Sequence, residues 1–377
     1  MNKTVWGALL AGTALGMTAF VAWHQSGAQQ QQADLQRILV PNRSLCAGVA
    51  AGAGQTPLST KTAFDVLGEA LISQAVANDT AHPDEQPLWV GLGPANWAIT
   101  TSSDKAKAYF NQGLRLSFNF NHHAAIRAFK TAQAADPDCA ICYWGEAFAL
   151  GPNINAPMAP EANGPALAAT AKAVALKDKA SGWEQALIDA IATRYSQDND
   201  RAALDLAFAQ AMLTVADAYP DNDDIAALAI EAQMDTTPWD YWQADLRTPK
   251  GQMGHALPRV QALLEKSPDH PAAIHLFIHI TEASANPAAA EPYAEKLAGL
   301  APNAGHLVHM PGHTFYRLGR FKDSIETNIK AVSIDEAYIA DTGAQSLYTF
   351  AYYPHNVHFV MASALMAGNG AMAKLAG

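Results

Sequence analysis

The feature that most constrains this chain is a repeated spacing of small, aromatic and proline residues. Pro268 and Pro302 stand 34 residues apart. In a helix pair, small residues let the two antiparallel helices approach closely, aromatic side chains fill the gap between them, and a proline ends the second helix. The period predicts an array of helix pairs. One unit has these residues at its fourth, eighth, twentieth, twenty-fourth, twenty-seventh and thirty-second places, counted from Ala106: Tyr109, Gly113, Ala125, Phe129, Ala132 and Pro137.

The unit from Ala106 to Pro137 resembles the tetratricopeptide repeat. The resemblance implies an all-α fold, a right-handed superhelical solenoid of antiparallel helix pairs. In this frame, units start near residues 106, 140, 189, 223, 271, 305 and 354. The sequence stops within the second helix of the last unit, so we expect the natural array to continue. Long loops or insertions between helices are expected over Gly151–Asn163, Asp235–Gly254 and Ile339–Tyr353.

Composition favours helix and excludes one class of partner. Ala, Leu, Glu and Gln are abundant, and these side chains lose little rotamer freedom in a helix. The formal net charge is −11, from 24 Lys and Arg against 35 Asp and Glu. Such a chain lacks the basic surface that binds phosphate backbones. We therefore expect no nucleic-acid partner.

The N-terminus has the pattern of an export signal. Lys3 precedes an apolar run that ends at Trp23, and small residues up to Ala28 suit a signal peptidase. We predict cleavage after Ala28 and a periplasmic or extracellular location. An uncleaved membrane anchor is the alternative, and is the only membrane contact expected. The predicted organisation is a signal at 1–28, a flexible spacer at 29–60, an N-terminal helical segment at 61–104 and the repeat array at 105–377.

Several short blocks resemble secreted bacterial tetratricopeptide proteins more closely than the generic repeat does. This closer resemblance implies the fold and export, but no particular activity. The sequence has no nucleophile elbow, phosphate loop or dinucleotide fingerprint, so we expect no nucleotide cofactor. The blocks are Phe110-Asn111-Gln112-Gly113-Leu114, Phe120-Asn121-His122, Cys142-Tyr143-Trp144-Gly145, Gly151-Pro152-Asn153 and His309-Met310-Pro311-Gly312-His313.

Two of the three cysteines form a close pair, Cys139 and Cys142, at the start of a predicted helix. In an exported chain a structural disulfide is the favoured interpretation. A redox pair or a metal clip is the alternative, because the helix dipole would lower the pKa of a thiol there.

Histidines recur at fixed places in three successive units. In the tetratricopeptide geometry carried over by resemblance, places two, five, nine and twelve of each first helix face the concave groove. Seven of the nine residues at places two, five and nine are histidine in the units from Pro271, Gly305 and Pro354. The groove-facing candidates are His275, His279, Glu282, His306, His309, His313, His355 and His358.

This histidine ladder predicts a metal site. Residues three or four apart on a helix lie about 5–6 Å from one another, so both imidazoles can reach one ion. Imidazole-rich sites suit zinc or copper first, and iron or nickel next. Glu282 is either a further ligand or a general base for a metal-bound water. The alternative is a metal-free scaffold whose groove holds a peptide or protein partner, the commonest use of this fold.

Overall fold

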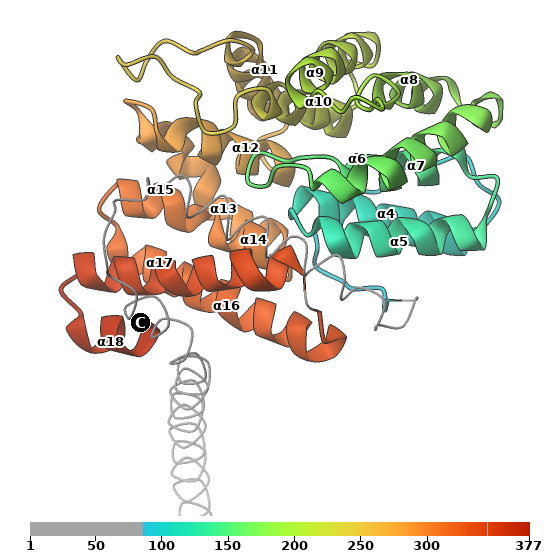
Figure 1. Ribbon diagram of the computed structural model, residues 1–377. Helices are drawn as coiled ribbons and strands as arrows, with labels where there is room; N and C mark the ends of the chain where they lie inside the picture. The colour runs from blue at the N-terminus through green and yellow to red at the C-terminus, as the bar shows by residue number, and fades with distance from the viewer. Residues whose placement is uncertain (1–85, 345) are drawn as a thin grey trace, which may run out of the picture.

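The computed structural model describes residues 86–344 and 346–377, and within these ranges the chain is built from helices (Figure 1). No β-strand occurs there, only two isolated bridges, one in each of two long loops. The predicted all-α class is confirmed. None of the helices in the described ranges has the length and apolar character needed to cross a membrane. The predicted signal, the spacer and residues 61–85 of the next segment lie outside the described residues.

The helices follow one another along a curved array, and each packs against its neighbours in sequence. Consecutive helices form antiparallel pairs such as α4 with α5, α9 with α10, and α16 with α17. Their bounds are α4 (Asp104–Phe118), α5 (His122–Ala135), α6 (Ala140–Leu150), α7 (Asn163–Ala175), α8 (Gly182–Ile191), α9 (Arg201–Ala218), α10 (Asp223–Asp235), α11 (Met253–Lys266), α12 (Pro271–Glu282), α13 (Glu291–Leu300), α14 (Gly305–His309), α15 (Pro311–Arg317), α16 (Phe321–Thr342), α17 (Tyr353–Met366) and α18 (Gly370–Ala376).

Small residues have the packing role that the repeat pattern predicts. A Cβ atom added to Gly113 on α4 would lie 2.7 Å from the Phe129 ring, and one added to Gly145 on α6 would lie 2.4 Å from it. Phe129 is fully buried on α5 between these helices. Glycine at both places therefore allows three successive helices to close around one aromatic ring.

Two sequence-based boundaries are wrong, and each has a local cause. Helix α8 begins at Gly182, well before the predicted unit start at residue 189, because Ser181 and Glu184 form a capping box there. Residues 86–103 form no helix, although they belong to the predicted N-terminal helical segment. There Gly91 and Gly93 have φ of 74° and 112°, in the left-handed region that ends helices.

Two of the three predicted loops are confirmed. The described chain has no α-helix between Leu150 and Asn163, or between Asp235 and Met253. The expected insertion at Ile339–Tyr353 is different: α16 continues to Thr342, and a π-helix, η5 (Tyr348–Tyr352), leads directly into α17. A π-helical turn is rare and often marks a functional site.

The first helix pair also contacts helices much later in the sequence. The Asn119 side chain, just after α4, accepts a hydrogen bond from the backbone N–H of Leu307 on α14 at 3.2 Å. The Trp97 indole donates to Asp224 on α10 at 2.7 Å. These bonds hold the segment before α4 against α10, and the end of α4 against α14, which contains two of the predicted metal ligands, His306 and His309.

Candidate metal centre

Six of the eight predicted residues are brought together in two groups of three histidines. The first trio is His275, His279 and His306, and the second trio is His309, His313 and His355. Within each trio, one candidate ligand atom from each residue lies within 4.8 Å of the others. Five of the six side chains are buried, and His355 is half-buried. Each trio could therefore hold one metal ion.

The first trio joins α12 to α14. His275 and His279 are one helical turn apart on α12, and their Nε2 atoms are 3.1 Å apart. The Nε2 atom of His306, from α14, lies 3.0 Å from that of His275. Two nitrogens bound to one zinc ion at 2.0–2.1 Å are about 2.9–3.4 Å apart for angles between 90° and tetrahedral. These contacts match that spacing.

The second trio joins α14, α15 and α17. The Nε2 atoms of His309 and His313 are 2.8 Å apart. His355 packs edge-on against His309, with ring centroids 4.9 Å apart, and lies 5.6 Å from the ring of His313. The trios adjoin each other, since the rings of His306 and His309 are 5.8 Å apart.

Hydrogen-bond acceptors fix the tautomers in the second trio. Nδ1 of His309 lies 2.5 Å from Oδ1 of Asn328, whose amide group is oriented by a 2.7 Å bond from Nδ2 to the Ser324 carbonyl. Nδ1 of His313 lies 2.8 Å from Oε1 of Glu282. Each Nδ1 must therefore carry a proton, which leaves a lone pair on each Nε2. Two lone pairs at 2.8 Å repel unless a cation, either a metal ion or a proton, lies between them.

In the part of the chain that the structure describes, only His275 of the first trio has a hydrogen-bond partner that orients its ring. The His275 ring is hydrogen-bonded to the backbone carbonyl of Phe118 at the end of α4. Because its Nε2 faces the other two imidazoles, the donor to that carbonyl is Nδ1, and the Nε2 lone pair points into the trio. The buried Nδ1 atoms of His279 and His306 have no hydrogen-bond partner among the described residues.

Burial keeps the imidazoles neutral, which is the form that binds metal ions. Desolvation, with a smaller contribution from nearby histidines, lowers the pKa of both His275 and His355 to about 3. Desolvation also lowers the pKa values of His279, His306 and His309 far below the ordinary imidazole range.

The other two predicted residues lie outside the trios. Glu282 bonds the outer nitrogen of His313, the position of a carboxylate that orients a ligand in metal sites. Although burial acts to raise its pKa, the interactions with His313, including their hydrogen bond, and the charge of Arg317 lower it overall, so the carboxylate is ionised at neutral pH. His358 is exposed on α17 and belongs to neither group.

Aromatic residues cover the trios, and no spacing in the sequence indicates their contacts. Phe120, held at φ 53°, packs against the rings of His275 and His306 with centroids 4.5 Å and 5.3 Å away. Tyr352 of the π-helix η5 lies 4.9 Å from the His306 ring. Trp239, from the loop before α11, lies 5.1 Å from the His279 ring. These rings reduce the access of water to the first trio.

Two glycines allow polar side chains to support the ligands. A Cβ on Gly312 would lie 2.4 Å from the Asn328 amide nitrogen, so glycine there lets Asn328 reach His309. A Cβ on Gly305 would collide with the carboxylate of Asp335. That carboxylate accepts a 2.8 Å bond from Tyr348, whose hydroxyl oxygen accepts the backbone N–H of His306 at 3.0 Å.

Cys139 and Cys142 form a disulfide at the start of α6, with Cα atoms 5.4 Å apart. Both cysteines are fully buried. Their sulfur atoms are used in this bond, so the structure does not combine them with the histidines in a metal site. The disulfide that the sequence favoured is therefore present.

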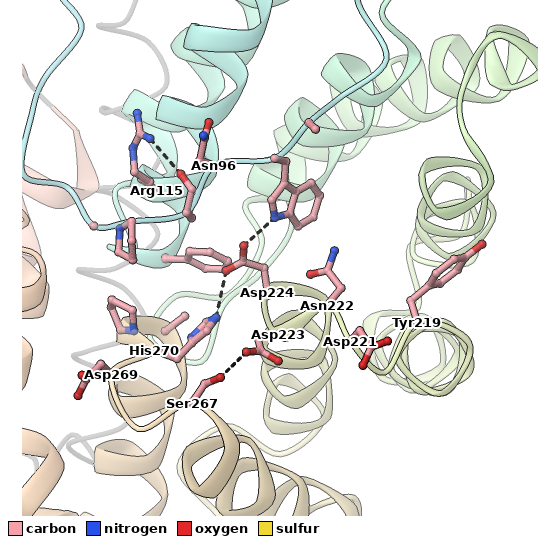
Figure 2. Close-up of a pocket in the computed structure, with 18 of the residues that line it drawn as sticks. Asn96, Arg115, Tyr219, Asp221, Asn222, Asp223, Asp224, Ser267, Asp269 and His270 are labelled. Carbon is pink, nitrogen blue, oxygen red and sulfur yellow. Dashed lines mark hydrogen bonds and ion pairs between the residues drawn. The ribbon is translucent and has the colours of Figure 1, made fainter.

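A pocket of about 960 Å³ opens at the amino ends of α10 and α12. Figure 2 shows Asp224 near its centre, bonded to His270. Phe118 and Leu307, which neighbour the first trio, form part of its wall. Acidic side chains predominate among its charged groups: Asp221, Asp223, Asp224 and Asp269 beside the single Arg115.

Comparison with known proteins gives no assignment. No protein-family model matches the chain, and no curated protein matches it with significance.

Proposed function

We propose that this protein binds two transition-metal ions, one in each histidine trio. The observation that carries the proposal is the 2.8 Å contact between Nε2 of His309 and Nε2 of His313. Both outer nitrogens donate to fixed acceptors, so both inner nitrogens present lone pairs to the same point. Zinc or copper is the first expectation and iron or nickel the second, because neutral imidazoles suit these ions.

The ligand number supports a reactive centre over a purely structural one. Structural zinc sites are closed by four protein ligands, whereas catalytic zinc sites keep three and leave a position for water or substrate. Each trio supplies three imidazoles. A metal ion bound there would polarise a bound oxygen ligand or lower the pKa of a bound water. We therefore propose a metalloenzyme-type centre without assigning its reaction.

Elemental analysis of protein purified without an affinity tag tests the proposal. We expect about two equivalents of one transition metal per chain after loading and gel filtration. Removing the metal with a chelator should lower the thermal midpoint, because an ion that binds only the folded state stabilises it by mass action. Absence of tightly bound metal after loading with zinc, copper, iron and nickel in turn would refute the proposal.

Asn328→Leu is expected to weaken the second site selectively. The change removes the acceptor of the His309 Nδ1 proton while keeping a side chain of similar size in a fully buried position. Loss of such an orienting partner typically costs 10–100-fold in metal affinity. A competitive titration against a colorimetric chelator should show one weakened site and one unchanged site, and equal weakening of both would contradict the assignment.

A second candidate function is a metal-free scaffold that binds a peptide or protein. The pocket at the amino ends of α10 and α12 favours it, since its acidic side chains would suit a basic segment of a partner. The same elemental analysis separates the two functions, because a scaffold would retain its fold and its pocket without any metal.

We also propose that the chain is an exported protein of the tetratricopeptide class. Helix starts at Asp104, Ala140, Asp223, Pro271 and Gly305 support the repeat frame. The Cys139–Cys142 disulfide supports export, because disulfides persist in oxidising compartments. Fractionation of the producing cells, with the mass of the mature N-terminus, would test the predicted cleavage after Ala28.

A further inference from the structure

Asp335 is a buried carboxylate on α16, a helix that packs against both α14 and α17 (Figure 1). The residue is 1% exposed. Its Oδ1 accepts a 2.8 Å hydrogen bond from the Tyr348 hydroxyl, and its Oδ2 accepts a 2.7 Å hydrogen bond from the side-chain amide of Asn356. One oxygen is therefore bonded toward α14 through Tyr348, and the other is bonded directly to α17.

The bond from Tyr348 connects Asp335 to α14, which carries one ligand of each trio, His306 and His309. The Tyr348 hydroxyl oxygen accepts the backbone N–H of His306 at 3.0 Å. This N–H lies in the first turn of α14, where a helix has no carbonyl of its own to accept it. Tyr348 therefore caps the short helix from which both ligands project, and Asp335 holds the cap in place.

The backbone at the start of α14 fits closely around this carboxylate. A Cβ atom added to Gly305 would collide with Oδ1 of Asp335 and would lie 2.8 Å from the Tyr348 hydroxyl oxygen. Any other residue at this position would push the carboxylate and the phenol away from α14. Glycine directly before His306 therefore allows the contact between α16 and α14.

The bond from Asn356 connects Asp335 to the first turn of α17, which carries a ligand of the second trio, His355. Asn356 is fully buried and directly follows His355 in the sequence. A rotation of α17 about its axis would break this bond. The same rotation would also move the His355 ring away from the ring of His309, whose centroid is 4.9 Å from it.

We propose that Asp335 is a positioning residue shared by the two trios, which holds α14 and α17 so that both sets of imidazoles converge on their metal ions. The inference rests on the proposed function. Asn328 and Glu282, in contrast, each bond one histidine, and both of these histidines belong to the second trio. Asp335 therefore makes two separate metal sites depend on one buried hydrogen-bond network.

Zinc titration against a colorimetric chelator at pH 8 tests the inference, with copper in its place if zinc does not fill both sites. Burial raises the pKa of Asp335 to about 7, so its carboxylate is ionised at this pH. Asp335→Asn keeps the shape of the side chain but has one acceptor oxygen, which cannot serve both Tyr348 and Asn356. The change is made in His275→Ala, which leaves the second site, and in His309→Ala, which leaves the first. We expect about 10–100-fold weaker binding at each site, the usual effect of losing an orienting partner.

Two further variants separate the branches of the network. Tyr348→Phe removes the hydroxyl that joins Asp335 to α14, and it should weaken the first site more than the second, where Asn328 also holds His309. Asn356→Leu removes the bond to α17, and it should weaken the second site and leave the first unchanged. A purely structural role would not divide the two affinities in this way.

Glu184→Gln is the matched control. Glu184 is also a fully buried carboxylate, and it accepts backbone N–H bonds from Thr100 at 2.8 Å and from Ser181 at 2.7 Å. It lies on α8, which packs against α6, α7 and α9. Its loss should lower the urea midpoint, as Asp335→Asn does, and leave both metal affinities unchanged.

The outcomes separate the inference from the metal centre itself. Two bound ions with affinities that Asp335→Asn does not change, or changes only as much as Glu184→Gln does, would overturn the inference and leave the centre intact. If Asp335→Asn does not fold, equal effects of Tyr348→Phe and Asn356→Leu on both sites would overturn it. An unaltered protein that binds neither zinc nor copper, iron or nickel would overturn both proposals.

Discussion

Replacing His275 with alanine is expected to abolish the first metal site and leave the second intact. The Nε2 atom of His275 lies 3.1 Å from that of His279 and 3.0 Å from that of His306, so it is the central ligand of its trio. Loss of an orienting partner already costs up to about 100-fold in affinity. Loss of the ligand itself should exceed that, and the metal content should fall from two ions per chain to one.

The stability of the metal-loaded protein should fall with the affinity. At a free metal concentration 100 times the Kd of the unaltered site, a site weakened 100-fold loses about 2.3 kcal/mol of the stabilisation by mass action. His275→Ala also leaves a cavity, so each variant is compared with its own chelated form by thermal denaturation. The metal-dependent part of the midpoint shift should be smaller in the variant.

His309→Ala and His358→Ala complete this experiment. His309→Ala should remove the second ion and spare the first, since His309 lies in the other trio. His358→Ala should retain both ions, because His358 is exposed outside the two groups. Loss of both ions in every variant would indicate a single coupled site, and retention of both would exclude the assigned ligands.

The register of the histidines was predictable because helix periodicity fixes which residues share a face. His275 and His279, four apart, predict one face of α12 from sequence alone. His358 is three residues from His355 on α17, yet it is exposed, because the buried face of this helix is formed by Asn356, Val360, Ser363 and Ala364. Periodicity therefore selects candidates, and the face that each helix buries decides which of them converge.

The division into two trios depends on tertiary packing and was not predictable. It follows from the break between α14 and α15 at Met310 and from the angles between separate helices. Asn328 and Phe120 have no spacing signal, because each reaches the histidines from a different helix pair. The helix start at Gly182, in contrast, could have been predicted from sequence. Ser181 and Glu184 have the spacing of a capping box, but the repeat frame placed the start of the unit at residue 189 instead.

Arg194→Met is expected to cause the largest loss of stability of any single change considered. Arg194 is 1% exposed, and its guanidinium bonds Asp235 at 2.9 Å and the Pro152 carbonyl at 2.8 Å. It also stacks over the Phe208 ring at 4.4 Å. Removing one partner of a buried ion pair typically costs 3–5 kcal/mol, because the other charge is left without compensation. Urea unfolding of the metal-free protein should show this as a lower midpoint.

A double variant distinguishes the lost charge pair from lost packing. Arg194→Met combined with Asp235→Leu removes both charges, and an apolar replacement of a whole buried pair is often neutral. We expect the double variant to recover most of the lost midpoint, with a coupling energy well above that of independent sites. Lys322→Met removes a charge from an exposed pair with Glu326 and should leave the midpoint unchanged.

The loss of stability caused by Arg194→Met should also depend on pH, and the buried carboxyls determine in which direction. Burial raises the pKa of Asp235 well above its ordinary range and that of Glu231 to about 7, while Arg194 lowers both. Without Arg194 both pKa values rise further. A carboxyl whose folded-state pKa is raised loses stability as pH rises through that value. The loss of stability in Arg194→Met should therefore be larger at pH 8 than at pH 5.5. A loss that is constant between these pH values would mean that packing, and not charge, is the role of Arg194.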